Sequence, residues 1–208
     1  NIKFIAIRNI PDKNKFTGIK KERIELNLSK EKKIIILQGS GINIDRGAEE
    51  LVMSMKYLSE NYLLLIIGGG DVINELKKIS QIEKLNSKVI FIPRLKPEEL
   101  FHYTINSDLG ITIDKDTNLN YRFSLPNKIF DYLNAGIPVL ASKLPEVEKL
   151  INKYEVGFFI NNHSPEHIAE MIESSLESDK YNSTRKNTYK ASIENSWEIE
   201  KKQWDLIL

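Results

Sequence analysis

The chain has 208 residues, of which 41% are hydrophobic and 28% are charged, and its 30 basic and 29 acidic residues leave a formal net charge of +1. This composition allows one large or two small domains with a buried core, and it provides no long-range field that would attract nucleic acid or anionic lipid. No cysteine is present, which excludes disulfides and thiolate chemistry and is typical of a cytoplasmic enzyme. No apolar run approaches the ~20 residues of a membrane span, and the first residue is Asn1 rather than Met, so we expect a fragment of a longer protein.

Six short runs are rich in Ile, Leu and Val and do not alternate with polar residues, as is typical of strands buried on both faces. We expect strands at residues 33–38, 63–67, 88–92, 109–113, 139–141 and 156–160. Between and after these runs, the apolar spacing predicts helices at residues 46–58, 72–79, 97–106, 127–135, 147–154 and 165–176. Repeated alternation of strand and helix predicts an α/β fold, a Rossmann-like, doubly wound parallel sheet of about six strands.

The two ends of the chain differ from this pattern. Residues 2–7 have the composition of another strand, whereas residues 11–29 are polar and rich in Lys, which favours an irregular or hairpin-like connector. Residues 195–208 form a predicted terminal helix with two tryptophans, which would pack either on this domain or on another domain.

Loops with candidate binding residues follow the first three predicted strands, and the first two of these loops contain glycines. The first loop begins with Gly39, Ser40 and Gly41 and ends at Arg46, whose guanidinium would either contact a phosphate or lie at the surface near the helix start. The strict dinucleotide fingerprint is absent because Ile44 occupies the third glycine position. This loop is therefore a weak indication of a phosphate site.

The second loop contains Gly68, Gly69 and Gly70, which would either approach a ligand or form a tight turn with no ligand. Arg94 follows the third strand, where the loop would either present its backbone to a base edge or simply expose the arginine. Ligands of doubly wound sheets bind at the carboxyl ends of the strands, so all three loops are candidates for one site.

Residues 125–142 contain the most informative segment, a polar helix start that leads through a Gly-x-Pro break into a buried strand. The N-terminus of such a helix suits a phosphate, and Lys128 and Asp131 share one of its faces. One would hold phosphate and the other a sugar hydroxyl. The alternative is an ordinary amphipathic helix with a weak surface ion pair.

No other pattern predicts catalytic chemistry. The chain has no cysteine cluster and no Gly-x-Ser-x-Gly turn, and Asp114 and Asp116 are a weak indication of a divalent ion. We therefore predict neither a metal site nor a cofactor.

Taken in order, these motifs resemble the C-terminal domain of GT-B-fold glycosyltransferases of the group 1, or family-4, type. The resemblance extends from about residue 33 to 181 and depends on Gly39-Ser40, Arg46-Gly47, Gly68-x-Gly70, Ser107-Asp-Leu-Gly110, and Pro126-Asn127-Lys128 with Asp131 and Gly136-x-Pro138. It implies that Asp131 binds the ribose hydroxyls and that Arg46 and Lys128 contact the diphosphate of a nucleotide sugar. The implied donor nucleotide site comprises Gly39, Ser40, Arg46, Gly68, Gly69, Arg94, Asn127, Lys128 and Asp131.

Two departures from the family pattern concern the donor. Asp131 stands where the family commonly has Glu, one methylene longer. Phe123 stands where the family often has a second Glu that contacts the donor sugar, and a phenyl ring accepts no such hydrogen bond.

The resemblance also implies a domain organisation. Residues 1–32 would be the last strand and linker of a missing N-terminal domain, residues 33–182 the nucleotide-sugar-binding domain, and residues 183–208 a helix that crosses back. The full enzyme would transfer a sugar from a UDP- or GDP-linked donor to an acceptor hydroxyl, with retention of configuration by analogy, in capsule or lipopolysaccharide synthesis. Its only membrane association would be peripheral and through the missing half.

Two alternatives to this function remain at the level of sequence. A degenerate, non-catalytic binding module agrees with Phe123, and a UDP-N-acetylglucosamine 2-epimerase has the same fold but requires acid, base and phosphate-loop groups that this sequence does not offer.

Overall fold

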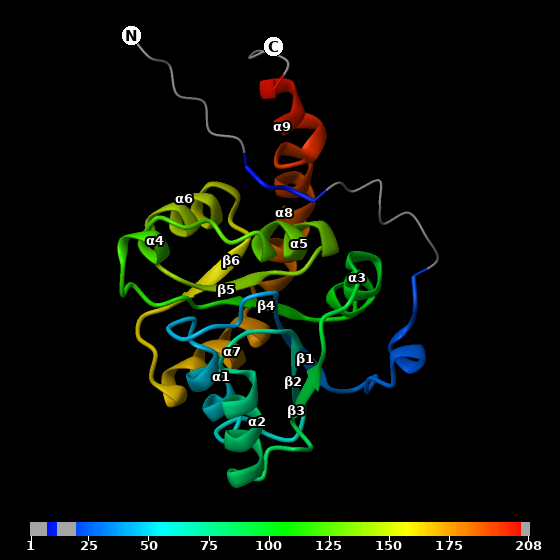
Figure 1. Cartoon of the computed structure of the whole chain (residues 1–208). Helices are drawn as coiled ribbons and strands as arrows, with labels where there is room; N and C mark the ends of the chain where they lie inside the picture. The colour runs from blue at the N-terminus through cyan, green and yellow to red at the C-terminus, as the bar shows by residue number, and fades with distance from the viewer. Residues whose placement is uncertain (1–7, 12–19, 205–208) are drawn as a thin grey trace.

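A computed structural model describes residues 8–11 and 20–204 as a parallel β-sheet covered by helices on both faces (Figure 1). The six strands lie in the order β3-β2-β1-β4-β5-β6, and every neighbouring pair is parallel. Their bounds are β1 Lys33–Gly39, β2 Tyr62–Gly68, β3 Val89–Ile92, β4 Leu109–Thr112, β5 Val139–Ser142 and β6 Gly157–Ile160. The predicted doubly wound sheet is confirmed, whereas the strand expected at residues 2–7 lies outside the described residues.

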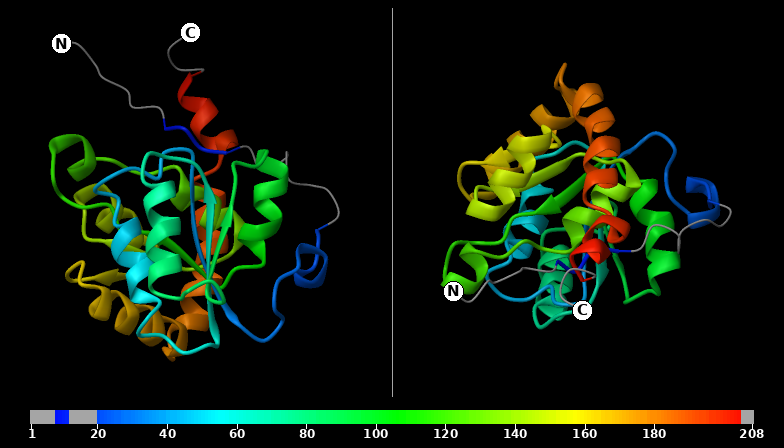
Figure 2. Two further views of the ribbon diagram at one scale, coloured as in Figure 1. Left: turned by 60° about the horizontal axis from the view of Figure 1, so that its bottom comes forward. Right: turned by 90° about the horizontal axis from the view of Figure 1, so that it is seen from above.

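Successive residues of the central strands belong to two different cores. Ile35 and Leu37 of β1 pack in the core beneath α1 (Ala48–Ser54), α2 (Ile73–Ile82) and α7 (Pro165–Glu177). Ile34 and Ile36 pack in the core of the opposite face, beneath α3 (Pro97–Ile105), α5 (Lys128–Ala135), α6 (Pro145–Tyr154) and α8 (Tyr181–Glu194). Figure 2 shows the two helical layers from two further directions. Because both faces are buried, the strands carry apolar residues on both faces instead of alternating with polar ones.

The sheet order contains a topological switch point between β1 and β4. The chain runs from β1 outward through β2 and β3, and then returns so that β4 pairs with β1, with Ile35 opposite Leu109 and Ile36 opposite Gly110. The connection that leaves β1 therefore runs toward one edge of the sheet, and the connection that leaves β4 runs toward the other edge. In sheets of this kind a crevice opens there, at the carboxyl ends of the strands.

The first helix is shorter than the predicted helix at residues 46–58. Gly47 precedes α1 with a φ of 71°, and a Cβ atom at this position would collide with the carbonyl oxygen of Ile113. The chain therefore turns tightly at Gly47, and Arg46 lies in the loop before α1 rather than in the helix. Two short elements were also not predicted, the 3-10 helix η2 (Arg23–Leu26) within the expected connector and α4 (Leu119–Arg122).

The C-terminal segment contains two helices where the resemblance implied one over residues 183–208, and the helix predicted at residues 195–208 corresponds to the second of them. Helix α8 ends at Glu194, α9 spans Trp197–Trp204, and the buried residues Asn195 and Ser196 separate them. The Asn195 side-chain amide donates to the carbonyl of Ala191 at 2.8 Å, which satisfies the end of α8. The sequence pattern missed α8 because most of its residues are polar. Within the described residues, no helix has the length and apolar character needed to cross a membrane.

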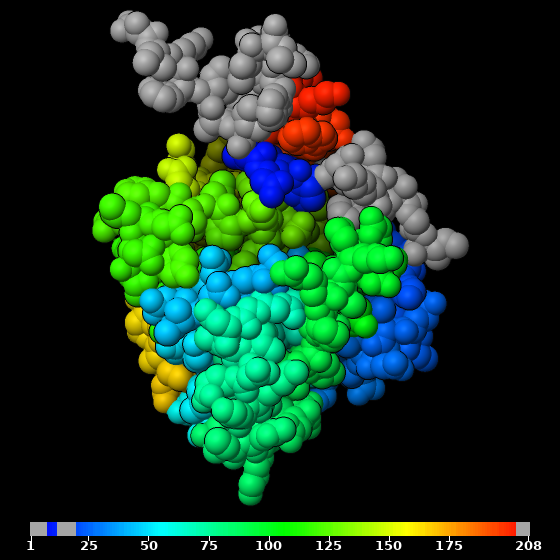
Figure 3. All heavy atoms as spheres, in the orientation of Figure 1, coloured from blue at the N-terminus to red at the C-terminus, as the bar shows by residue number. Residues whose placement is uncertain are grey.

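The segment at residues 8–11 lies against α9 (Figure 3). The Arg8 guanidinium donates to both Glu200 and Asn195, at 2.8 Å and 2.7 Å, and it lies 5.6 Å from the centre of the Phe130 ring. The two ends of the described chain thus meet above α5.

Candidate functional site

A cavity of about 560 Å³ opens at the carboxyl ends of β1 and β2, beside the first turn of α5. It brings together most of the residues that the sequence predicts for one site: Gly39, Ser40, Arg46, Gly68, Arg94, Asn127, Lys128 and Asp131. These residues come from four separate loops. Their convergence places the candidate site at the switch point of the sheet.

Gly69 is the predicted site residue that does not line this cavity. Its N–H donates to the Gly39 carbonyl at 3.1 Å, and its own carbonyl accepts from the Ile42 N–H at 2.8 Å. Gly68 has a φ of 137°, and a Cβ atom there would collide with the Gly39 carbonyl. The glycines of this second loop therefore let it pass close to the first loop, which agrees with the tight-turn alternative.

Arg46 is held at one side of the cavity by an acidic and an aromatic side chain. Its Nη1 atom lies 3.5 Å from Oδ2 of Asp114, which follows β4 and is 1% exposed. The centre of the Tyr121 ring lies 5.0 Å from the guanidinium carbon. Asp114, which the sequence suggested weakly for a divalent ion, therefore faces a cation of the chain itself.

Lys128 begins α5 and lies half-buried in the same cavity. Burial lowers the pKa of Lys128, the negative charge of Asp114 opposes this shift, and the positive charge of Arg46 reinforces it. A bound anion would act in the same direction as Asp114 and favour the charged ammonium. The pair of cations, together with the N-terminal end of α5, makes this wall of the cavity suitable for a polyanionic group.

Asp131 lies one turn further along α5. Burial raises the pKa of its carboxyl group to about 6, and a hydrogen bond from Gln38 opposes this shift. The Gln38 Nε2 atom donates to Oδ2 of Asp131 at 3.0 Å. Lys128 and Asp131 are not partners in any ion pair found among the described residues, so the surface-pair alternative is not what the structure shows.

Arg94 is exposed at the rim of the cavity. Its Nη2 atom donates to the carbonyl of Ser40 at 3.1 Å and so bridges the loops that follow β3 and β1. Arg94 is thus both exposed and part of the cavity lining, so its exposure does not exclude the predicted binding role.

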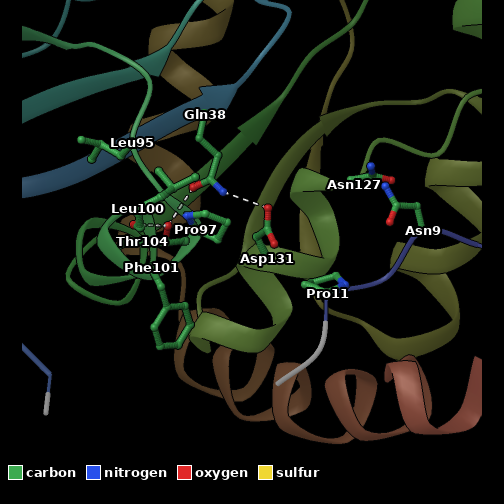
Figure 4. A pocket seen from close by; sticks show the side chains of 10 residues that line it. All are labelled: Asn9, Pro11, Gln38, Leu95, Pro97, Leu100, Phe101, Thr104, Asn127 and Asp131. Atoms are coloured by element: carbon green, nitrogen blue, oxygen red, sulfur yellow. Dashed lines mark hydrogen bonds between the residues drawn. The ribbon is translucent and has the colours of Figure 1, made fainter. Parts of the chain in front are cut away.

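A second cavity, of about 260 Å³, adjoins the first and shares Gln38, Asn127 and Asp131 with it (Figure 4). The rest of its lining is mostly apolar and comes from α3, the loop before α3 and the N-terminal segment: Asn9, Pro11, Leu95, Pro97, Leu100, Phe101 and Thr104, of which Leu95, Pro97 and Leu100 also line the larger cavity. The sequence patterns predicted neither this wall nor Gln38 as part of the site. One signal was available, because Gln38 is the single amide at the end of an apolar strand run.

The family model for group 1 glycosyl transferases matches residues 19–193, which is most of the chain. The chain belongs to the group 1 glycosyltransferases. A curated relative is TuaH of Bacillus subtilis strain 168, whose name provisionally assigns it to teichuronic acid biosynthesis as a glycosyltransferase. It is 28% identical over 121 residues, which are 57% of this chain and 30% of TuaH.

Solved glycosyltransferase structures have the same fold. HepE from Anabaena, solved in complex with UDP, has a TM-score of 0.78 and 16% identity over 97% of this chain and 56% of HepE. The C-terminal domain of the group 1 protein LpcC from Francisella tularensis has a TM-score of 0.67 and 16% identity over 88% of this chain and 96% of that domain. This group 1 chain thus spans less than a third of TuaH and about half of HepE, and it has the GT-B domain fold of these structures.

Phe123, at the position where the family often has a second Glu, lies at the end of α4 and is 58% exposed. It is not among the residues that line either of the two adjoining cavities.

Proposed function

We propose that this chain is the donor-binding domain of a glycosyltransferase that takes a sugar from a UDP- or GDP-linked donor. The observation that carries the proposal is the convergence of Arg46, Lys128 and Asp131 on one cavity at the switch point of the sheet. Binding of UDP and of UDP-glucose by HepE, which has the same fold, supports it.

In this proposal the two cations and the N-terminal end of α5 receive the diphosphate, and the carboxylate of Asp131 accepts hydrogen bonds from ribose hydroxyls. The base would lie toward the loop that carries Arg94. Gly39 and Ser40 would present their backbone to the phosphates, and Gly68, which packs against the Gly39 carbonyl, lines the same cavity. Asn127 stands beside Lys128 at the start of the helix.

The transfer breaks the bond between the anomeric carbon and the diphosphate oxygen, and the bonding electron pair leaves with the diphosphate. The acceptor hydroxyl forms the new bond to the same carbon, and its proton passes to the departing diphosphate. Negative charge grows on the diphosphate in the transition state, so Arg46 and Lys128 would stabilise the transition state more than the ground state. The scheme includes no metal or cofactor, and retention of configuration is part of the proposal by analogy with the family.

The acceptor and the groups that activate it would come from a second, N-terminal domain, as the roughly half-length match to HepE suggests. The name of TuaH favours surface polysaccharide assembly as the process. On this proposal the chain by itself binds the nucleotide but does not transfer sugar.

Calorimetric titration of the chain with UDP and with GDP tests the donor site. We expect one of the two to bind, with an affinity that falls at least about 10-fold in Arg46→Ala and in Asp131→Ala, equivalent to one charge-assisted hydrogen bond each. Lys77→Ala, which removes an exposed cation on α2, is the matched control and should bind like the parent. No heat with either nucleotide at millimolar concentration would refute the donor site.

A binding module without transferase activity is the second candidate, and it is favoured by Phe123, which stands where the family often has a Glu and cannot accept a hydrogen bond from a donor sugar. Such a module would bind the nucleotide sugar no more tightly than the nucleotide. A competition titration of UDP-glucose against UDP, or of the corresponding GDP pair, distinguishes the donor site from the binding module. A donor site should bind the nucleotide sugar more tightly than the nucleotide.

A further inference from the structure

Gln38 places a polar amide inside the central strand of the sheet, where burial without partners would be costly. The residue is 2% exposed, and both ends of its amide are engaged. The Thr104 hydroxyl donates to Oε1 at 2.8 Å, and Nε2 donates to Oδ2 of Asp131 at 3.0 Å (Figure 4). The amide thus connects a helix on one side of the cavity to the acid on the other.

Thr104 determines which way the Gln38 amide points. Its side chain is 1% exposed on α3, and its hydroxyl lies 2.8 Å from Oε1 of Gln38 and 3.0 Å from the Leu100 carbonyl. A hydroxyl has one proton, so it donates to one of these oxygens at a time. When it donates to Gln38, the amide nitrogen must point toward Asp131.

The same three side chains have a second consistent arrangement. If Asp131 is protonated, it can donate to Oε1 of a flipped Gln38 amide, whose nitrogen donates to Thr104, whose hydroxyl then donates to the Leu100 carbonyl. In the first arrangement Asp131 is an acceptor only. The orientation of Gln38 and the ionisation of Asp131 are therefore linked.

We propose that Gln38 and Thr104 are positioning residues of the nucleotide site, which hold Oδ2 of Asp131 so that Oδ1 is available to a ligand hydroxyl. Among the hydrogen bonds of the described residues, Oδ2 is the Asp131 carboxylate oxygen that is engaged, and Asp131 lines both cavities. The inference rests on the proposed donor function and adds to it the residues that orient the acid toward ribose.

The charged groups around Asp131 define what else can influence its titration. Lys128 lies one turn earlier on the same helix, Arg46 projects from the loop after β1, and Arg94 projects from the loop after β3 into the larger cavity. In the smaller cavity Asp131 is the only charged residue among those lining it in the described chain. Gln38 is thus the direct neutral partner of the carboxylate, and removing it leaves all three cations in place.

The test uses the full chain and the nucleotide, UDP or GDP, that binds the parent more tightly, with inorganic pyrophosphate as a probe that lacks ribose. Calorimetric titrations from pH 5 to pH 8 are compared for the parent, Gln38→Met and Thr104→Val. For the parent we expect nucleotide affinity to fall as pH drops through about 6. For Gln38→Met we expect an affinity about 10-fold lower at pH 7 and a midpoint shifted to higher pH, because the ionised acid has lost a donor.

Thr104→Val should shift the midpoint in the same direction by a smaller amount, and it keeps the proposal testable if Gln38→Met folds poorly. Pyrophosphate affinity should be unchanged in both variants because Arg46 and Lys128 are intact. An unchanged midpoint, or equal losses for nucleotide and pyrophosphate, would overturn the positioning role while leaving the donor site in place. Failure of the parent to bind either nucleotide would instead overturn both proposals.

Discussion

Arg46 Nη1 lies 3.5 Å from Oδ2 of Asp114, a carboxylate that is 1% exposed at the carboxyl end of β4. The two residues are far apart in the sequence and lie in the loops that follow β1 and β4, the two strands that flank the switch point. The buried acid therefore draws the cation to the edge of the cavity by an ion pair, although neither Asp114 oxygen has a hydrogen-bond partner in the described chain. A phosphate that binds Arg46 would meet a side chain that this ion pair already restrains, which lowers the entropy cost of binding.

Removing the cation of this pair should destabilise the fold. In Arg46→Ala we expect the free energy of unfolding to fall by about 2 kcal/mol, because Asp114 is left buried without its partner. The double variant Arg46→Ala/Asp114→Asn should recover part of this loss. Urea denaturation of the parent, Arg46→Ala, Asp114→Asn and the double variant gives the complete double-mutant cycle. Arg122→Ala, in an exposed pair with Asp116, is the control and should change stability by less than about 0.5 kcal/mol. Simple additivity of the two single changes would contradict the pairing.

Gly110 of β4 lies directly under the ring of Tyr132, and a Cβ atom at this position would collide with that ring. Gly110→Ala should therefore lower the free energy of unfolding by about 1–3 kcal/mol, as expected for an overpacked core. The same change at Gly69, where a Cβ atom would meet no atom within 4 Å, should be close to neutral. Thermal denaturation of Gly110→Ala and Gly69→Ala measures the two losses of stability. Equal losses at the two glycines would be inconsistent with the packing of Tyr132 on Gly110.

The ionised carboxylate of Asp131 should lower the free energy of unfolding at neutral pH in the absence of ligand. Burial raises its folded-state pKa from 3.8 to about 6, so the folded chain binds this proton more tightly than the unfolded chain does. The resulting stabilisation is complete below about pH 4 and is lost as pH rises through about 6.

Asp131→Asn, which does not titrate, should therefore unfold at higher urea than the parent at pH 7.5, with an advantage that shrinks between pH 6 and pH 4. Asp116→Asn, at an exposed position, serves as the control. If Asp131→Asn is less stable than the parent at pH 7.5, the carboxylate does not carry the expected desolvation cost.

Arg8 should couple the N-terminal segment to α9. Its backbone N–H and its guanidinium donate to the Glu200 carboxylate, which is 0% exposed. Arg8→Ala leaves this acid buried with no guanidinium, and we expect a loss of about 3 kcal/mol. Hydrogen exchange should then accelerate in α9 before the central strands.

The control for Arg8 is Lys190→Ala, since Lys190 and Glu194 form an exposed pair at 4.0 Å on α8 that is worth only about 0.3 kcal/mol. Nucleotide affinity should also fall in Arg8→Ala, because Asn9 and Pro11 line the smaller cavity. Unchanged exchange in α9 would show that the contact with Glu200 does not anchor this helix.

Strands and the helices that cover them were predictable because burial on both faces leaves a plain apolar signal in short runs. Helix α8 was not predictable from the apolar spacing. It is a polar helix that contacts the core through a few small residues such as Thr188 and Ala191, so its sequence has no clear helical periodicity. The short α1 was mispredicted at its start for a different reason: the turn at Gly47 depends on a carbonyl of Ile113, which lies far along the chain.

The sequence by itself determined the parallel sheet, the four loops and the residue types able to bind a nucleotide, because these depend on local composition and on the alternation of strand and helix. The tertiary structure decided which of these residues share a cavity. It put Gly69 into a turn rather than the cavity wall, paired Arg46 with Asp114, and joined Gln38 to Thr104 and Asp131. Such relationships link residues distant in the chain, and only the packing of the sheet and its helices brings their polar atoms within hydrogen-bonding or ion-pair distance.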